Sequence, residues 1–90
     1  MVTEYYLGII DKDADSAFGM WFPDMPGCFP ATDEFDELPR AAAELLREHV
    51  EALERYGIAR PKPRPIAEVM ADRDVRRSLR AGATTMLVPF

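Results

Sequence analysis

The 90-residue sequence predicts a single α+β domain, residues 1–90, in which a small antiparallel sheet of three to four strands is covered on one face by a long helix. Aromatic and β-branched residues are concentrated in residues 4–10 and 17–22. Residues 36–56 repeat apolar side chains at helical spacing, and residues 84–89 form a last strand-like run. The expected order is strand, strand, a short third strand, two helical regions and a final strand.

The first two segments are expected to pair as a hairpin, with the polar residues 11–16 as its connection. Because side chains alternate along a strand, Phe18, Met20 and Phe22 share one face and Trp21 points to the other. If the first face packs on the long helix, Trp21 is either an exposed binding residue or is covered by the C-terminal segments. Both alternatives stay open on the sequence alone.

The second strand ends in a rigid corner, Phe22-Pro23-Asp24-Met25-Pro26-Gly27-Cys28. Proline fixes φ and has no N–H to donate, so Pro23 is expected to end strand pairing. Pro26-Gly27 is typical of a type II turn, in which glycine supplies the positive φ of the third position. Strands and corner together are expected to span residues 3–31. The corner is predicted to be structural, and Cys28 to be a buried, inert thiol.

The long helix predicted over residues 36–56 has one apolar and one charged side. Its repeating apolar residues are Leu38, Ala42, Leu45, Leu46, Leu53 and Tyr56. The charged side offers three ion pairs at i,i+4 spacing, Arg40–Glu44, Arg47–Glu51 and Glu51–Arg55. Pro39 fits the first turn, which makes Asp36 the expected N-cap, and Gly57 is the expected stop.

The C-terminal third begins with a stiff proline-rich connector, residues 61–65. Short helices are predicted within residues 66–80, and a strand over residues 84–89. Four arginines that share one side of the second short helix are a candidate nucleic-acid contact: Arg73, Arg76, Arg77 and Arg80. No aromatic or glycine pattern of a nucleic-acid module accompanies them.

The net charge of −5 conceals two halves of opposite sign. Residues 1–57 carry a net charge of −9, and residues 58–90 a net charge of +4. An acidic body repels nucleic acid and attracts a basic partner. The basic segment 58–82 is expected to bind nucleic acid, to bind an acidic partner, or to complement the acidic half of the chain itself.

The corner and its surroundings resemble the N-terminal domain of HicB-type antitoxins over roughly residues 3–66. The matching features are Tyr5-Tyr6, the run from Phe18 to Cys28, Thr32 with the acidic residues 33–37, and Gly57-Ile58 after the helix. The family pattern is a strand that ends in Phe-Pro-Asp-Leu-Pro-Gly-Cys and is followed by a long helix. The resemblance implies the same topology, which is often likened to an incomplete ribonuclease H fold.

The resemblance also implies a function, that of a non-enzymatic antitoxin. Its partner would be a small basic HicA-type toxin, an mRNA-cleaving ribonuclease, whose RNA-binding face an acidic surface would cover. The expected partner-binding residues are Trp21, Asp33, Glu34, Glu37, Glu44, Glu48 and Glu51. HicB-type antitoxins usually continue into a DNA-binding module, which these 90 residues do not reach, so operator binding is not expected of them.

The sequence is also compatible with two other functions. One is a stand-alone oligomeric protein that regulates or binds nucleic acid through the arginines of residues 73–80. Self-association to a homodimer or a larger oligomer is expected both for this alternative and for the antitoxin, because the domain is small and has sheet edges to protect. The less favoured one is a degenerate ribonuclease H-like hydrolase, because two-metal chemistry requires converging carboxylates. Nothing in the sequence brings its candidates together: Asp11, Asp24, Asp33 and Glu48.

Other site chemistries find little support. Asp11-x-Asp13-x-Asp15 has the spacing that begins a calcium loop, but Ser16 and Phe22 stand where the loop requires glycine and glutamate. His49, the only histidine, has no nucleophile at a recognisable spacing. We therefore expect no metal and no cofactor. A single cysteine, no signal peptide and no membrane-length apolar run favour the cytoplasm.

Overall fold

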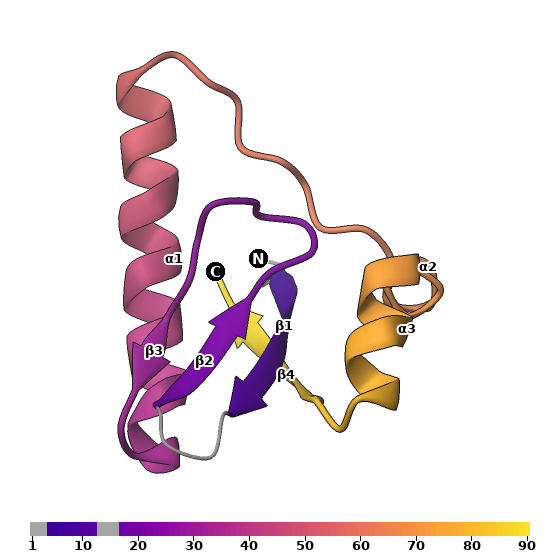
Figure 1. Ribbon diagram of the computed structural model, residues 1–90. Helices are drawn as coiled ribbons and strands as arrows, with labels where there is room; N and C mark the ends of the chain where they lie inside the picture. The colour runs from indigo at the N-terminus through magenta and orange to yellow at the C-terminus, as the bar shows by residue number, and fades with distance from the viewer. Residues whose placement is uncertain (1–3, 13–16) are drawn as a thin grey trace.

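The computed structural model describes residues 4–12 and 17–90 and shows an antiparallel sheet with helices on both faces (Figure 1). The sheet has four strands in the order β3-β2-β1-β4. They are β1 (Tyr5–Lys12), β2 (Phe18–Trp21), β3 (Ala31–Thr32) and β4 (Thr84–Pro89). The predicted α+β architecture, a small antiparallel sheet with one long helix, is confirmed. Asp13 and Asp15, on which the calcium-loop interpretation rests, lie outside the described residues.

The register of β1 against β2 decides which side chains face the long helix α1 (Leu38–Arg55). Ile10 pairs with Met20, and Ile9 pairs with Trp21, so these two pairs lie on opposite faces of the sheet. The core on the α1 side joins sheet and helix residues: Tyr6, Ile10, Met20, Phe22, Leu38, Ala42, Leu46 and Val50. Phe18 packs against the same core, as the alternation predicts.

The start of the long helix differs from the prediction. A short 3-10 helix, η1 (Phe35–Glu37), precedes α1, and the N–H of Glu37 donates to the carbonyl of Glu34 at 3.2 Å. The expected N-cap at Asp36 is therefore wrong, because Asp36 lies inside this tight turn and no side chain caps α1. At the other end Gly57 adopts φ +71°, and its N–H donates to the Glu54 carbonyl at 3.0 Å. Glycine thus ends the helix as predicted.

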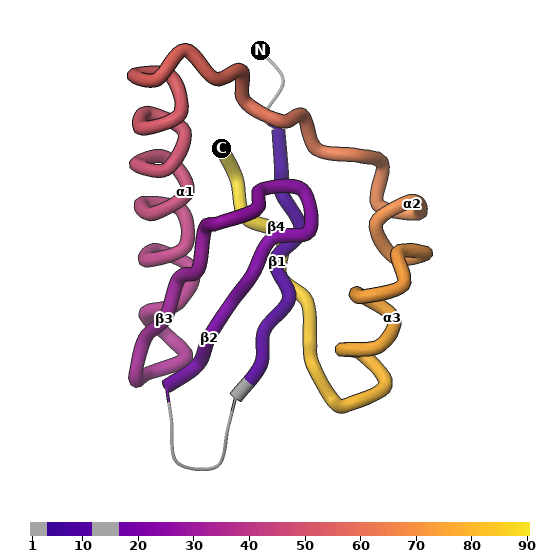
Figure 2. Tube along the Cα trace, turned by 45° about the horizontal axis from the view of Figure 1, so that its top comes forward, coloured from indigo at the N-terminus to yellow at the C-terminus, as the bar shows by residue number. Residues whose placement is uncertain are grey.

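Two short helices cover the opposite face of the sheet, α2 (Ile66–Met70) and α3 (Arg73–Arg80). Val69 and Val75 form a second buried cluster there with Leu7 and Ile9 of β1. Trp21 packs against this cluster and is half-buried, so the C-terminal helices cover it in part. Figure 2 shows the connector crossing from the end of α1 to α2 past the corner that follows β2. Within the described residues, none of the helices has the length and apolar character needed to cross a membrane.

Candidate functional site

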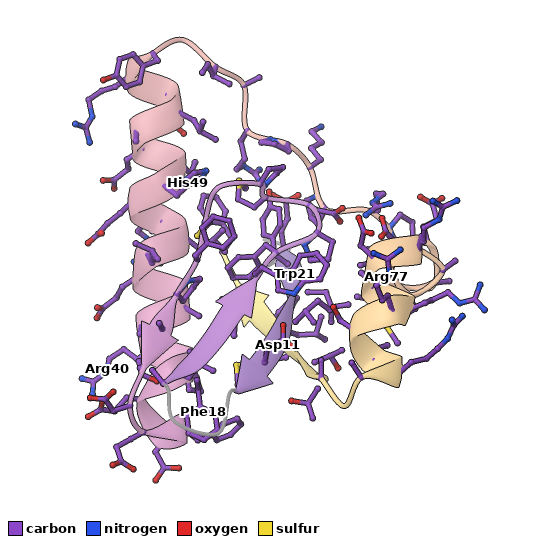
Figure 3. The ribbon with its side chains drawn as sticks, viewed as in Figure 1. Asp11, Phe18, Trp21, Arg40, His49 and Arg77 are labelled. Carbon is purple, nitrogen blue, oxygen red and sulfur yellow. The ribbon has the colours of Figure 1, made fainter. Side chains whose placement is uncertain are left out.

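The proline-rich corner is a buried structural joint. Met25 and Cys28 are buried, and the Met25 N–H donates to the Phe22 carbonyl at 3.1 Å. Gly27 has φ +88°, as the predicted turn requires, and a Cβ atom there would lie 3.3 Å from Cε1 of His49. His49 points from α1 toward this corner (Figure 3), so the lone histidine packs on the glycine. Burial raises the pKa of the Cys28 thiol to about 11, which keeps it protonated and unreactive near neutral pH.

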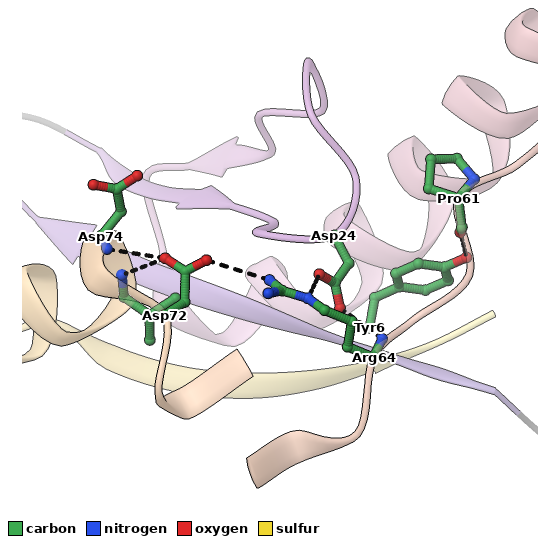
Figure 4. A network of polar contacts seen from close by, with 7 residues as sticks. Tyr6, Asp24, Pro61, Arg64, Asp72 and Asp74 are labelled. Atoms are coloured by element: carbon green, nitrogen blue, oxygen red, sulfur yellow. Dashed lines mark hydrogen bonds and ion pairs between the residues drawn. The ribbon is translucent and has the colours of Figure 1, made fainter. Parts of the chain in front are cut away.

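A polar network ties the corner to the connector and to α3 (Figure 4). Arg64 donates to Asp24 twice, from Nε to Oδ1 at 2.6 Å and from its backbone N–H to Oδ2 at 2.8 Å. Its Nη2 also donates to Oδ2 of Asp72 at 3.4 Å. The other carboxylate oxygen of Asp72 caps α3 by accepting from the N–H groups of Asp74 and Val75. Asp24 therefore holds the segment that positions α2 and α3 over the sheet.

The network also shifts the pKa values of Asp72 and Arg64. Desolvation raises the pKa of Asp72, but the hydrogen bonds from the Val75 and Asp74 N–H groups outweigh it, so the pKa is lower than usual. The hydrogen bond to Asp24 raises the pKa of Arg64. Both groups thus stay charged across the physiological pH range.

A second anchor holds the start of the connector to β1. Arg60 donates from Nη1 to the Tyr6 hydroxyl and from Nη2 to Oε1 of Glu4, each at 2.6 Å. The Tyr6 hydroxyl donates in turn to the Pro61 carbonyl at 2.5 Å. The Arg60 guanidinium lies 4.7 Å from the Phe90 ring centroid, a cation–π contact. No spacing in the sequence predicts either anchor, because the partners are 40 to 56 residues apart.

Loss of the Asp24 anchor should destabilise the domain. We expect Asp24→Ala to lower the free energy of unfolding by about 1–2 kcal/mol, because Arg64 loses the two hydrogen bonds that it donates to a nearly buried carboxylate. The loss stays moderate because the Arg64 side chain is partly exposed and water can solvate it. Urea unfolding of both proteins measures the difference. The matched control is Asp33→Ala, an exposed aspartate, which should change the free energy by less than about 0.5 kcal/mol. Equal effects of the two changes would show that the anchor contributes nothing.

The predicted acidic residues gather on and beside the outer side of α1. Glu44, Glu48 and Glu51 are exposed along the helix, whereas Asp33, Glu34 and Glu37 are exposed where it begins. These six residues are called the acidic face below. The predicted i,i+4 pairs of α1 are wrong: the ion pairs within the described residues involve only Arg60 and Arg64. Long exposed side chains lose rotamer entropy when they pair in water, which offsets the weak attraction. The carboxylates are therefore available to a partner.

A groove of about 250 Å³ runs between β3 and α1 beside this acidic face. Glu44 and Glu48 line it together with apolar residues: Pro30, Ala31, Ala41 and Leu45. Phe29, next to Pro30 in the chain, is 68 % exposed. The sequence indicated the two glutamates but not the groove, because one side of its apolar wall, Pro30 and Ala31, comes from the segment after the corner.

The arginines of α3 form a second charged surface on the other side of the sheet. Arg73, Arg76, Arg77 and Arg80 are exposed and line, with Ala71, a groove of about 260 Å³. These four residues are called the arginine face below. The sheet lies between α1 and α3 (Figure 1), the helices that carry most of the acidic face and all of the arginine face, so the two surfaces of one molecule cannot neutralise each other directly.

The carboxylates of the hydrolase alternative come from separate elements. Asp11 is exposed near the end of β1, Asp24 is paired with Arg64, Asp33 precedes η1, and Glu48 lies on the outer side of α1. In the described part of the chain, no group of three or more histidine, cysteine or acidic side chains is arranged to hold a metal ion. The structure thus gathers exposed carboxylates along α1 but does not bring these four together.

The comparisons with known proteins agree on one family. A model of the HicB-like antitoxins of bacterial toxin–antitoxin systems matches residues 6–88. A chain of the HicA3 and HicB3 toxin–antitoxin complex superimposes with a TM-score of 0.75 at 28 % identity, over 93 % of this chain and 94 % of that one.

Two solved antitoxins are longer than this chain. The HicB antitoxin of Burkholderia pseudomallei matches with a TM-score of 0.74 at 26 % identity, over 98 % of this chain and 62 % of that one. The HicB3 antitoxin matches with a TM-score of 0.73 at 30 % identity, over 93 % of this chain and 60 % of that one. Sequence comparison gave no match to a curated protein.

Proposed function

Because the chain belongs to the HicB-like antitoxins of bacterial toxin–antitoxin systems, we propose that it binds and neutralises a small basic toxin of the HicA type. The toxin would be an mRNA-cleaving ribonuclease, as the family resemblance implies. A similar chain belongs to a complex of HicA3 with HicB3, which supports a toxin as the partner. The chain acts by binding rather than by catalysis, and the site of action is the cytoplasm, where mRNA is translated.

The observation that carries the proposal is the set of exposed carboxylates around the groove between β3 and α1, which have no ion pair within the described part of the chain. Glu44 and Glu48 stand on its wall, and Glu51 continues the same side of the helix by about one further turn. A basic side chain entering the groove would find carboxylates at its rim and apolar contacts from Pro30 and Leu45 inside it. Such a mixture of an apolar centre and a charged rim is typical of protein interfaces.

The mechanism is competition with RNA for one basic surface. A ribonuclease holds its substrate by contacts of lysine and arginine with phosphates, and carboxylates satisfy the same cations. With the acidic face in place, RNA would meet both steric exclusion and the repulsion of like charges. The acidic half of the chain, with a net charge of −9, should also speed the encounter with a basic toxin.

The test first searches the adjacent reading frame for a small basic HicA-type ribonuclease and then combines that protein with the chain. We expect a stoichiometric complex by size-exclusion chromatography with light scattering, and complete loss of RNA cleavage at equimolar antitoxin. The affinity should fall as salt is raised, because charge complementarity contributes to it. A complex that leaves cleavage unchanged would contradict occlusion, and the absence of a complex would overturn the proposal.

A further inference from the structure

We propose that the arginine face of α3 binds the phosphate backbone of a nucleic-acid strand. The proposal does not depend on the toxin, because the arginine face lies on the opposite side of the sheet from the acidic face (Figure 1). It rests on three observations: the spacing of the arginines, the lack of carboxylate partners for them among residues 4–12 and 17–90, and the chemistry of the groove that they line.

The four arginines share one side of a short helix. They occupy positions i, i+3, i+4 and i+7 of α3, which lie on one face because an α-helix has 3.6 residues per turn. The opposite side of the same helix is held against the sheet by Val75, which is fully buried. The guanidinium groups are thus presented outward from a helix whose orientation the core and the Asp72 cap both fix.

None of the four arginines has a carboxylate partner among the described residues. The other two arginines of the C-terminal half, Arg60 and Arg64, are both ion-paired within the chain. Asp72, just before the cluster, is already used by Arg64 and by the N–H groups of α3. Asp74, inside the cluster, makes no ion pair among the described residues. The pairs Arg73–Arg77 and Arg76–Arg80 instead place like charges at i,i+4, which destabilises a helix. A bound polyanion would relieve this repulsion.

The groove favours phosphate over a protein as the occupant. Among the described residues its lining consists of the four arginines and Ala71, so the only apolar surface is that of the arginine stems and one methyl group, whereas the centre of a protein interface is depleted in charge and enriched in aromatic side chains. One face of an eight-residue helix is also small beside the roughly 800 Å² per partner of a stable protein interface. Phosphate oxygens, in contrast, match the planar fork of arginine in pairs of hydrogen bonds.

The ligand would be bound without regard to its sequence. No aromatic side chain of the described residues lines the groove, so these residues offer no platform on which a base can stack. Contacts restricted to phosphates position a strand but do not read its bases. At physiological salt, charges are screened over about 8 Å, so the acidic face across the sheet weakens this site only slightly. The chain could therefore hold a basic protein on one side and a nucleic-acid strand on the other.

The experiment is a salt titration of binding to a labelled 20-nucleotide poly(U) RNA, followed by fluorescence anisotropy, with a duplex DNA of equal length as a second probe. We expect the logarithm of the binding constant to fall with the logarithm of salt concentration, with a slope of roughly −2 to −3 for three or four phosphates of a single strand. Arg76→Gln/Arg77→Gln should weaken binding at least tenfold and reduce the slope by about 1.4. Removal of two repelling charges should also raise the melting temperature at low salt.

The matched control is Arg47→Gln/Arg55→Gln on α1, which removes the same charge from the other side and should change affinity less than twofold. A second measurement needs no variant: poly(U) added to the isotopically labelled wild-type chain should shift the backbone amide signals of α3 and leave those of α1 unchanged. The proposal is overturned if binding is independent of salt or if both double variants lose equal affinity. It is also overturned if the wild-type chain self-associates in light scattering and Arg76→Gln/Arg77→Gln is monomeric, because the arginines would then hold a second copy.

Discussion

Leu46→Ala is expected to lower the free energy of unfolding by about 3–5 kcal/mol. Leu46 is fully buried in the core between α1 and the sheet, where Met20 and Phe22 belong to the same cluster. Truncation removes buried methyl groups and leaves a cavity that a packed helix and sheet cannot close. A domain of 90 residues has a total stability of about 5–13 kcal/mol, so this single change should remove a large share of it.

The measurement is urea unfolding followed by two probes. Circular dichroism reports mainly the helices, and the fluorescence of Trp21, the only tryptophan, reports the packing of α2 and α3 on the far face of the sheet. Coincident transitions would show that both faces unfold together. Leu87→Ala is the matched control, because this leucine is 49 % exposed and the same truncation should cost less than about 1 kcal/mol. A smaller loss for Leu46 than for Leu87 would contradict the assignment of the core.

The sequence predicted the sheet and the layer formed by α1 because both rest on local periodicity, and it left open whether the C-terminal helices cover the far face. Alternation in β2 separated Phe18, Met20 and Phe22 from Trp21, and the register with β1 keeps that division. The helical repeat likewise located the buried side of α1, with Leu38, Ala42 and Leu46. It was wrong at the end of the helix, where Tyr56 is 82 % exposed, and it omitted the buried Val50. Gly27 and Gly57 could be predicted for the same reason, since a positive φ is a property of one residue.

What the sequence did not predict depends on contacts between distant residues. Asp36 was expected to cap the helix, but a 3-10 turn satisfies the first N–H groups instead. The link from Asp24 to Arg64 spans 40 residues and leaves no periodic signal. The candidate site likewise has a part that the sequence predicted and a part that it did not. The spacing of Glu44, Glu48 and Glu51 on one side of α1 was predictable, whereas the apolar wall of the groove beside them depends on where the corner returns the chain.

Reversal of two charges on the acidic face is expected to abolish most toxin binding. Glu44→Lys/Glu48→Lys should weaken the complex about 100-fold or more, which corresponds to about 2.7 kcal/mol, because attraction to a basic surface becomes repulsion. Glu44→Gln/Glu48→Gln should lose less, about tenfold, since it removes attraction without adding repulsion. Stability should change by less than about 0.5 kcal/mol in both variants, because both glutamates are exposed and have no ion pair among the described residues.

A control must distinguish the effect of the net charge on toxin binding from the effect of where the charges lie on the molecule. The control is Glu68→Lys/Asp74→Lys, which changes the net charge equally through two exposed acids of α2 and α3 on the other side of the sheet. Calorimetric titration with the toxin should give the wild-type affinity for this control to within about threefold, because at physiological salt charges beyond about 8 Å are screened. If both reversals weaken binding equally, the toxin responds to overall charge and the groove between β3 and α1 is not its docking site. If only Glu44→Lys/Glu48→Lys does so, and ribonuclease activity returns in proportion, the carboxylates of α1 are the groups that exclude RNA.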